Sequence, residues 1–324
     1  MVEQIQSNGL NEVIDLQEDL SRGEVGKLVL LFSKYPKYKS VVAMASAGLP
    51  VSKAMVITGS GSMAEDRCQG ILTNWDVERT IIRTDRIGGT VNSPSVQGVK
   101  IEDVWTTSKN LLNEGLLPMV IAQGDIFHNN YSVNILVDPK NPDSVYLEIV
   151  GPGFSATDIN RRRIVNERGE LAGGRGRFIL RSNSVVSQRD YNEQVELLKE
   201  NLIKREEKKR SAPFPNIEEA DRWVNDFLEQ EEALILQHPS YDPIPSKYLK
   251  RVWDFVPQML LAGKNLRLGD NPFIVSMSFV QEDEKDNPYF WDIHPYSGYR
   301  KTEAGHPKEG IEGMKWRYFN REGD

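Results

Sequence analysis

The period of the hydrophobic positions changes several times in the N-terminal half of the chain. Residues 41–48 (VVAMASAG) carry apolar side chains at helical spacing before a glycine, which predicts a short helix that ends there. Residues 27–33 (KLVLLFS) and 54–58 (AMVIT) are short apolar runs, and we expect a strand at each, with a helix ahead of the first. The pattern predicts a further strand over residues 79–84 and a helix over residues 101–115.

Three strands are expected to follow in direct succession. They occupy residues 118–126 (PMVIAQGDI), 131–138 (YSVNILVD) and 144–150 (SVYLEIV). Alternating helices and strands followed by such a meander favour mixed sheets over a parallel, doubly wound sheet. The fold class that we expect is therefore α/β (α+β), with mixed sheets and helices.

The C-terminal part of the chain has a mainly helical pattern. Residues 190–210 predict a charged amphipathic helix, and residues 217–237 and 245–263 predict two more. Residues 271–283 (NPFIVSMSFVQED) predict a strand, and the chain after Asp286 is aromatic and rich in turn residues.

A boundary is expected near residue 213. The segment SAPFPN, residues 211–216, has two prolines in six residues, which is typical of a linker. The division separates a region of residues 1–212 from a helical and aromatic region of residues 213–324, whose role the sequence does not reveal.

Residues 131–150 predict an antiparallel hairpin around the loop PKNPD. In this register Asn134 faces Glu148. Side chains alternate along a strand, so one face of the first strand is apolar and is expected to pack inward. That face consists of Tyr131, Val133, Ile135 and Val137. The opposite face collects oxygen-bearing groups around Glu148.

The polar face of the hairpin is a candidate metal site. Magnesium prefers oxygen ligands from a few residues, completed by water and by substrate phosphates. Glu148, Asn134 and Asp138 are the ligands that we expect. The alternative is that Glu148 and Asn134 lie on the solvated side of a sheet and bind nothing.

Composition and charge narrow the class of protein. The 324 residues carry a net charge of −7 with a pI near 5.4, which disfavours nucleic acid as a partner of the whole protein. The chain has one cysteine, so it can form no internal disulfide, which fits a reducing compartment. Its four histidines are scattered without the spacing of zinc ligands. The N-terminus has no signal-peptide pattern, and no apolar run approaches the ~20 residues that span a bilayer. We expect a cytoplasmic protein with no membrane segment, and a homo-oligomer is an open option.

Residues 37–58 (KYKSVVAMASAGLPVSKAMVIT) resemble the opening of the ATP-binding domain of phosphoenolpyruvate synthase and pyruvate phosphate dikinase. The family's lysine falls on Lys37, and the segment TIIRTDR places its arginine on Arg83. The resemblance implies that these two residues contact nucleotide phosphates, while Glu148 and Asn134 hold magnesium. Lys53 is a further nucleotide-binding residue that we expect. The glycine- and serine-rich loop after residue 58 could hold phosphates through its backbone N–H groups, at Gly59 and Gly61, and a plain turn is the alternative.

The order of these features is similar to that of the ATP-grasp fold. The resemblance implies ATP and Mg²⁺ as cofactors, and catalysis that rests on positioning and charge neutralisation by residues such as Arg83. We expect an enzyme of the ligase type, which phosphorylates a carboxylate and lets an amine displace the phosphate. A small phosphotransferase is the alternative. Val150 stands where the family's last strand has an amide, which favours a third possibility: a non-catalytic binding protein on a degenerate ATP-grasp scaffold.

Two further groups of residues carry chemistry. The arginines of residues 161–181 begin with Arg161, which we expect to contact an anionic small-molecule or peptide substrate as a catalytic residue; a solvated helix face is the alternative. The same basic stretch is the main support for a nucleic-acid-binding protein. Asp292 and His294 fall on one face if their segment is extended, as an acid–base pair or as structural residues.

Overall fold

The computed structural model describes residues 12–23, 25–75, 77–87, 95–122, 128–156, 159, 164–174, 177–207, 210, 212–282 and 285–296. It divides into two compact units. The first unit holds the described residues up to 122, together with 257–269 and 289–294. The second unit holds those of 128–256, 270–288 and 295–296. The domain boundary expected near residue 213 stays a prediction.

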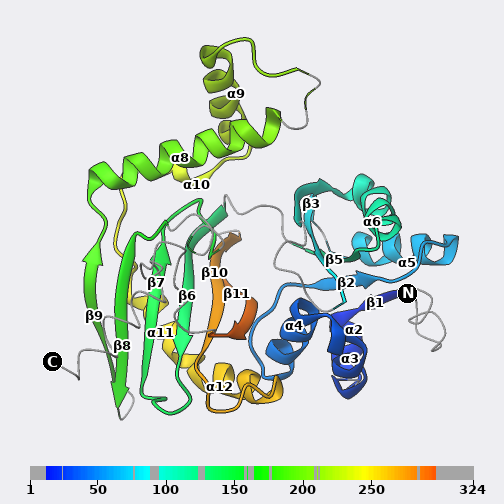
Figure 1. The fold of residues 1–324 in the computed structure, drawn as a ribbon, viewed down its shortest axis with the longest axis horizontal. Coiled ribbons are helices and arrows are strands. Elements are labelled where there is room, and N and C mark those ends of the chain that lie inside the picture. Colours follow the sequence, from blue (N-terminus) through cyan, green and yellow to red (C-terminus); the bar gives the residue numbers. More distant parts are fainter. Residues whose placement is uncertain are drawn as a thin grey trace, which may run out of the picture. The chain divides into compact units, whose positions relative to one another are not determined.

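The first unit contains a five-stranded sheet with the order β1-β2-β5-β3-β4 (Figure 1). Its neighbouring strands pair antiparallel. The strands are β1 (Val13–Asp15), β2 (Ala54–Ile57), β3 (Arg79–Asp85), β4 (Ser95–Lys100) and β5 (Leu117–Ile121). The strands expected over residues 54–58 and 79–84 are thereby confirmed, as is the first part of the one expected over residues 118–126, of which residues 123–126 lie outside the described residues.

Helices pack in two groups on this sheet. The first group has α2 (Leu16–Ser21), α3 (Val25–Leu31) and α4 (Pro36–Ser46), which pack on one another, and the second has α5 (Ser62–Thr73) and α6 (Val104–Asn113). Short 3-10 turns, η1 (Phe32–Lys34) and η2 (Ile101–Asp103), follow α3 and precede α6, and α12 (Val256–Asn265) belongs mainly to this unit. Pro36 opens α4, and the helix stops before Gly48, whose φ of 80° suits a glycine, as the sequence predicted.

The strand expected over residues 27–33 is wrong, because this segment forms α3 and η1. Leu28 and Phe32, four residues apart, are almost fully buried, while Leu30 between them is 76% exposed. A strand would place all three side chains on one face, whereas a helix separates Leu30 from the other two. The apolar run is too short for periodicity to distinguish the two structures.

The second unit is built on a six-stranded sheet with the order β11-β10-β6-β7-β8-β9 (Figure 1). The strands are β6 (Asn129–Val137), β7 (Ser144–Val150), β8 (Glu167–Gly174), β9 (Arg177–Val185), β10 (Phe273–Glu282) and β11 (Lys285–Pro295). Residues 289–294 of β11 belong to the first unit. Two antiparallel sheets with packed helices confirm the mixed α/β class and exclude a parallel doubly wound sheet for the described residues.

The tail after Asp286 was expected to be turn-rich, which is wrong for the described residues up to 295, since they form β11. Pro288 lies within this strand and cannot donate a backbone hydrogen bond. β11 tolerates the proline because it is an edge strand of its sheet.

The helices of the second unit are α8 (Gln188–Glu207), α9 (Ile217–Gln230), α10 (Leu234–Gln237) and α11 (Ser246–Asp254). Asn216 caps α9, because its side-chain oxygen accepts the Glu219 N–H at 2.8 Å. The ring of Tyr248 in α11 lies 5.2 Å from the ring of Tyr131 in β6 and 4.6 Å from that of Phe279 in β10. α11 therefore packs on the apolar face of the sheet, the face that the hairpin pattern predicted to be inward.

Candidate functional site

Four polar side chains form a row straight across the sheet of the second unit. The strand register places Ser276 of β10 opposite Asn134 of β6, Asn134 opposite Glu148 of β7, and Glu148 opposite Arg168 of β8. Directly opposed residues point to the same face of a sheet. We call these four residues the polar row. The register expected for the hairpin, with Asn134 facing Glu148, is confirmed.

Two side-chain hydrogen bonds lie within the polar row. The hydroxyl of Ser276 donates to Oδ1 of Asn134 at 2.6 Å, and Nε of Arg168 donates to Oε1 of Glu148 at 3.0 Å. One step along the same face, the hydroxyls of Ser132 and Ser278 lie 2.8 Å apart. The row therefore lies within a larger polar patch that runs across the four strands β10, β6, β7 and β8.

The polar row is inside the protein. Asn134 and Glu148 are each 0% exposed and Ser276 is 4% exposed, so the alternative of a solvated sheet face is wrong. The side chain of Arg168 retains 20% exposure. Burying a carboxylate has a large desolvation cost unless a charged partner and hydrogen bonds offset it, and Arg168 supplies that partner.

The donor atoms of the polar row suit two kinds of ligand. A carboxylate oxygen of Glu148 and the amide oxygen of Asn134 are the hard ligands that Mg²⁺ takes in small number, with phosphates and water in its remaining positions. The guanidinium of Arg168 has donors that match phosphate or carboxylate oxygens. An oxygen-ligated cation next to an anion-binding group is the arrangement that a metal–nucleotide complex needs.

Asp138 lies apart from this row. It follows the last residue of β6, and its Oδ1 accepts the backbone N–H of Lys140 at 3.0 Å, which stabilises the turn into β7. Four strand residues separate it from Asn134, a distance of roughly 13 Å. Within the part of the chain that the structure describes, no three His, Cys, Asp or Glu side chains gather in a way that could hold a metal ion.

In the first unit, Lys37 and Arg83 come together around the end of β3. Nζ of Lys37 donates to the backbone oxygen of Thr84 at 3.0 Å, and the backbone N–H of Lys37 donates to Oδ2 of Asp85 at 2.9 Å. Nη1 of Arg83 donates to the backbone oxygen of Trp291 at 2.7 Å. The two residues that the family resemblance singled out are therefore neighbours on α4 and β3.

Asp85 supplies the negative charge at this place. Its carboxylate is fully buried, accepts the backbone N–H groups of Lys37 and Arg86, and faces the positive end of α4. Burial raises the pKa of Asp85, while these hydrogen bonds and the charges of Lys37 and Arg83 oppose the shift. The carboxylate of Asp85 therefore already occupies the anion-binding position at the N-terminus of α4.

The glycine loop after β2 is packed against Glu12. A Cβ atom on Gly59 would lie 2.7 Å from the side chain of Glu12, and one on Gly61 would lie 3.2 Å from its Oε2. Gly59 therefore allows the close approach of the Glu12 side chain, whereas a Cβ atom on Gly61 would require only a small shift of its carboxylate. Lys53 precedes the same strand, is exposed, and its backbone oxygen accepts the Ala122 N–H at 2.9 Å.

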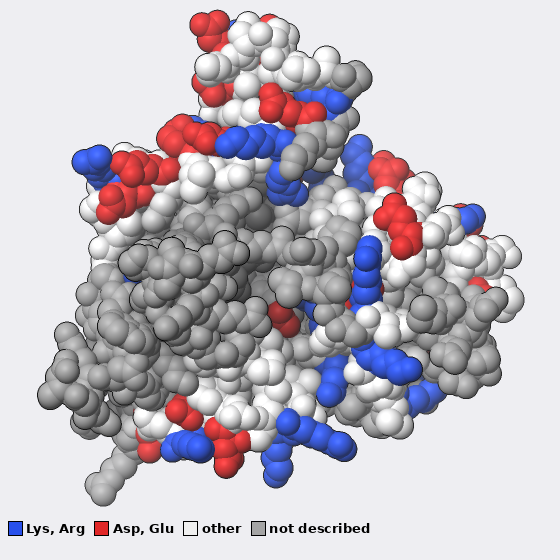
Figure 2. Space-filling view, in the orientation of Figure 1, with Lys and Arg blue, Asp and Glu red and all other residues white. Residues whose placement is uncertain are grey.

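Arg161, with Arg162 and Arg163, lies outside the described residues, and its expected contact with substrate stays a prediction. Of the other arginines in residues 161–181, the structure describes the side chain of Arg168 and places it in the polar row. Elsewhere, the basic side chains of α8 alternate with acidic ones (Figure 2), and several pair at i,i+4, as Lys204 does with Glu200 at 3.3 Å. α8 therefore does not present the single-sign surface that nucleic acid requires.

Asp292 and His294 do occupy one side of β11, as alternation predicted. Nδ1 of His294 lies 3.8 Å from Oδ2 of Asp292, too long for a hydrogen bond. Their side chains are 32% and 39% exposed. The pair is a loose surface contact within the first unit.

Sequence reasoning missed the roles of Ser276, Asp85 and Arg168. Ser276 belongs to a strand that was predicted, so alternation within that strand could have marked it, whereas Asp85 lies one residue beyond the predicted strand of residues 79–84. Arg168 was grouped with a basic loop because residues 167–174 (ERGELAGG) have one large apolar side chain and three glycines. That composition gives no strand signal.

Comparisons with known proteins complete the description. No protein-family model and no curated protein matches the chain. The fold is similar to the D-alanyl-alanine synthetase A of Vibrio cholerae O1 biovar eltor, with a TM-score of 0.39 and 9% identity over 81% of this chain and 56% of that one. It is also similar to the macrocyclase MdnC of Microcystis aeruginosa MRC, with a TM-score of 0.33 and 8% identity over 79% of this chain and 51% of that one. The chain spans about half the length of these two proteins.

Among the described helices, none has the length and apolar character to cross a membrane.

Proposed function

We propose that this protein is a Mg²⁺- and ATP-dependent enzyme of the ATP-grasp type, and that the polar row holds the metal of its metal–nucleotide complex. The observation that carries the proposal is the buried pair of Asn134 and Glu148, directly opposed on β6 and β7 and joined to Arg168. Buried charged groups in a sheet are unfavourable for stability, and their presence is characteristic of functional sites.

In the proposed site, Glu148 and Asn134 would be the protein ligands of Mg²⁺. The ion would neutralise phosphate charge and align the reacting phosphate. Arg168 lies against the same carboxylate and would neutralise it when the ion is absent. Its guanidinium is also the group that would bind a phosphate oxygen when the ion is present.

Binding at this site requires the protein to open. Asn134 and Glu148 have no solvent exposure in this structure, so an incoming ion and nucleotide must displace the groups that cover them. We therefore expect association to be limited by this conformational change rather than by diffusion.

The proposal assigns nucleotide binding to residues of the first unit. Lys37 and Arg83 would bind nucleotide phosphates, with Lys53, Gly59 and Gly61 as further nucleotide contacts and Arg161 as a contact to the substrate. The carboxylate of Asp85 keeps Lys37 and Arg83 beside each other but also competes for their charge. Asp138 would support the β6–β7 turn rather than bind the metal.

The reaction that we favour is ligation of a carboxylate to an amine through an acyl phosphate. A phosphoryl group would pass from ATP to the carboxylate, ADP would leave, and the amine would then displace phosphate. There are two alternatives to a ligase: a small phosphotransferase, and an inactive scaffold that keeps only the fold.

Isothermal calorimetry of ATP binding tests the proposal. We expect saturable binding that requires Mg²⁺ and is lost in EDTA. Lys37→Gln and Arg83→Gln should each weaken binding by about tenfold or more, because a charge-assisted hydrogen bond to phosphate is worth about 1.5–3 kcal/mol. Lys39→Gln, on the same helix as Lys37, is the matched control and should bind as the wild type does. Absence of heat with Mg²⁺-ATP at millimolar concentration would reject the nucleotide site and leave the scaffold alternative.

Product analysis separates the two enzymatic alternatives. In a ligase, ADP and inorganic phosphate appear together when both the carboxylate and the amine are supplied, and hydroxylamine in place of the amine displaces phosphate from the acyl phosphate to give a hydroxamate. In a phosphotransferase, the phosphoryl group stays on the acceptor and no hydroxamate forms.

A further inference from the structure

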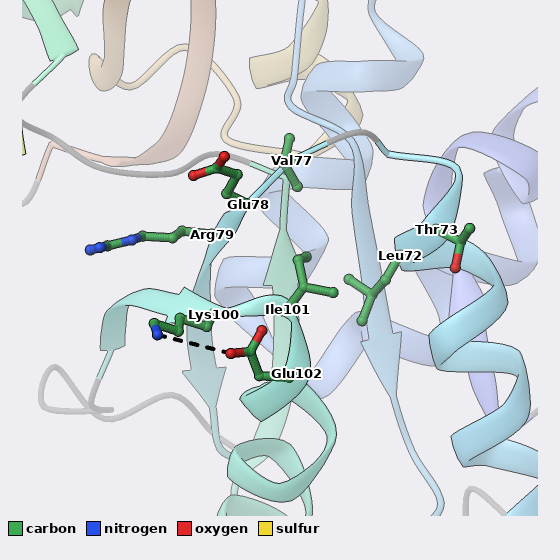
Figure 3. A pocket seen from close by; sticks show the side chains of 8 residues that line it. All are labelled: Leu72, Thr73, Val77, Glu78, Arg79, Lys100, Ile101 and Glu102. Atoms are coloured by element: carbon green, nitrogen blue, oxygen red, sulfur yellow. Dashed lines mark ion pairs between the residues drawn. The ribbon is translucent and has the colours of Figure 1, made fainter.

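The first unit has a hollow of about 560 Å³ between the end of α5, the residues that lead into β3, and the junction of β4 with η2 (Figure 3). Its volume lies in the range of small-molecule sites, roughly 300–1,000 Å³. Part of its lining is apolar, from Leu72, Val77 and Ile101. None of its lining residues belongs to the polar row.

The walls of the hollow are held by backbone hydrogen bonds. Arg79 and Lys100 are directly opposed where β3 pairs with β4, and the Ile101 N–H donates to the backbone oxygen of Glu78 at 3.2 Å. The charged and apolar lining residues therefore sit on paired backbone segments. A ligand would meet a largely preformed surface.

The charged side chains occur in both signs around one end of the hollow. Figure 3 shows Glu78, Arg79, Lys100 and Glu102 at that end, beside the apolar side chains. Arg79 and Lys100 are directly opposed on β3 and β4, so two cationic side chains start from adjacent backbone positions at this end of the hollow. Nζ of Lys100 lies 3.9 Å from Oε1 of Glu102, and their side chains are 61% and 73% exposed, so this pair is weak.

We propose that this hollow binds a zwitterionic peptide ligand with apolar side chains, of about the size of a dipeptide. Its carboxylate would lie against Arg79 and Lys100. Its ammonium group would approach Glu102, and its apolar side chains would cover Leu72, Val77 and Ile101. The two lining cations and two lining anions balance, so a simple anion would meet Glu78 and Glu102 and a simple cation would meet Arg79 and Lys100.

The site goes beyond the proposed ATP-dependent activity and does not depend on it. All its residues lie in the first unit, and binding there needs neither ATP nor Mg²⁺. The exposed charges give a weak site, and we expect a dissociation constant of about 1 mM.

Nuclear magnetic resonance titration of the full chain with leucyl-leucine, without nucleotide, tests the proposal. We expect saturable shifts of backbone amide signals, centred on residues 72–79 and 100–102. N-acetyl-leucyl-leucine lacks the ammonium charge and leucyl-leucine amide lacks the carboxylate charge. Each derivative should bind about fivefold more weakly, the factor for one exposed ion pair.

Two variants test the charges of the protein. Lys100→Gln should weaken the dipeptide about fivefold but leave the amide derivative unchanged, and Glu102→Gln should weaken the dipeptide but leave the acetylated derivative unchanged. Lys109→Gln on α6, an exposed lysine outside the hollow, is the control and should bind as the wild type does. No saturation up to about 20 mM, or equal binding of the dipeptide and both blocked derivatives, would overturn the proposal.

Discussion

Nε of Arg168 lies 3.0 Å from Oε1 of Glu148, and the two side chains differ in exposure, 20% against 1%. The carboxylate is therefore enclosed while its cationic partner reaches solvent. An enclosed carboxylate depends on the cation paired with it, because removal of that cation leaves more of the desolvation cost uncompensated. The pair links the stability of the second unit to the site that we propose for the metal.

Removal of one partner should be more harmful than removal of both. We expect Arg168→Met to lower the free energy of unfolding by about 3 kcal/mol, since it leaves Glu148 buried without its cation. The double variant Glu148→Leu/Arg168→Met should lie within about 1 kcal/mol of the wild type or above it. Urea unfolding followed by circular dichroism measures both. Additive losses, with the double variant the least stable, would contradict this account of the pair.

The pH dependence of stability should report the carboxyl group of Glu167. Its Oε2 accepts the hydroxyl of Tyr241 at 3.1 Å and the backbone N–H of Ile244 at 3.0 Å. Burial raises the pKa of Glu167 above its ordinary 4.5, and these hydrogen bonds oppose the shift in part. A carboxyl with a raised pKa binds more protons in the folded state, so its stabilisation is full at acidic pH and is lost as pH rises through the folded-state pKa.

Glu167→Gln should remove the loss of stability that the wild type shows as pH rises. The neutral amide oxygen of glutamine can accept the hydrogen bonds from Tyr241 and Ile244 without carrying a charge. We expect the free energy of unfolding of the variant, relative to the wild type, to increase as pH rises from below 4.5 to neutral. Urea unfolding at a series of pH values measures it, with Glu170→Gln on the same strand as the control. A difference between variant and wild type that does not change with pH would refute the assignment.

Two glycine substitutions should have opposite effects. A Cβ atom on Gly151 would lie 2.7 Å from the ring of Tyr241, so Gly151→Ala should displace that ring and lower the free energy of unfolding by about 1–3 kcal/mol. Gly70, within α5, has open space at its Cβ position, and Gly70→Ala should raise stability by about 0.5–1 kcal/mol through helix propensity. Thermal unfolding measures both, and equal effects of the two changes would show that the Tyr241 contact is not close in solution.

The β6–β7 hairpin could be predicted in detail because its information is local. Alternation along residues 131–137 and a short Pro/Asn/Asp loop determine both the pairing and the face of each side chain. Asn134 and Glu148 could therefore be assigned to each other from the sequence alone. The exposure of that face could not, since both faces of β6 and β7 are buried and alternation alone does not reveal what covers a polar face.

β8 could not be predicted, because its glycines serve contacts distant in sequence. A Cβ atom on Gly173 would lie 2.0 Å from Cζ2 of Trp253 in α11, so the strand needs a glycine there to admit the indole ring. Such a glycine is typical of a turn in a sequence. Because β8 was missed, so was its register with β7, which is the relation that brings Arg168 to Glu148.

The cluster of Lys37, Arg83 and Asp85 was only partly predictable. The resemblance to ATP-binding domains selected the two cations, but nothing local to residues 79–85 marks Asp85 as the internal anion of a helix 48 residues earlier. That relation comes from the packing of α4 on the sheet.

The most direct test of the central claim is the shift in melting temperature that Mg²⁺-ATP produces in the wild type, Glu148→Gln and Glu170→Gln. A ligand at 100 times its dissociation constant adds about 2.7 kcal/mol, which corresponds to roughly 4 °C for a chain of this length. We predict that shift in the wild type and in Glu170→Gln, its loss in EDTA, and its absence in Glu148→Gln. A shift that is the same in Glu148→Gln as in the wild type, or no shift in any of the three, would contradict a metal–nucleotide site at the polar row.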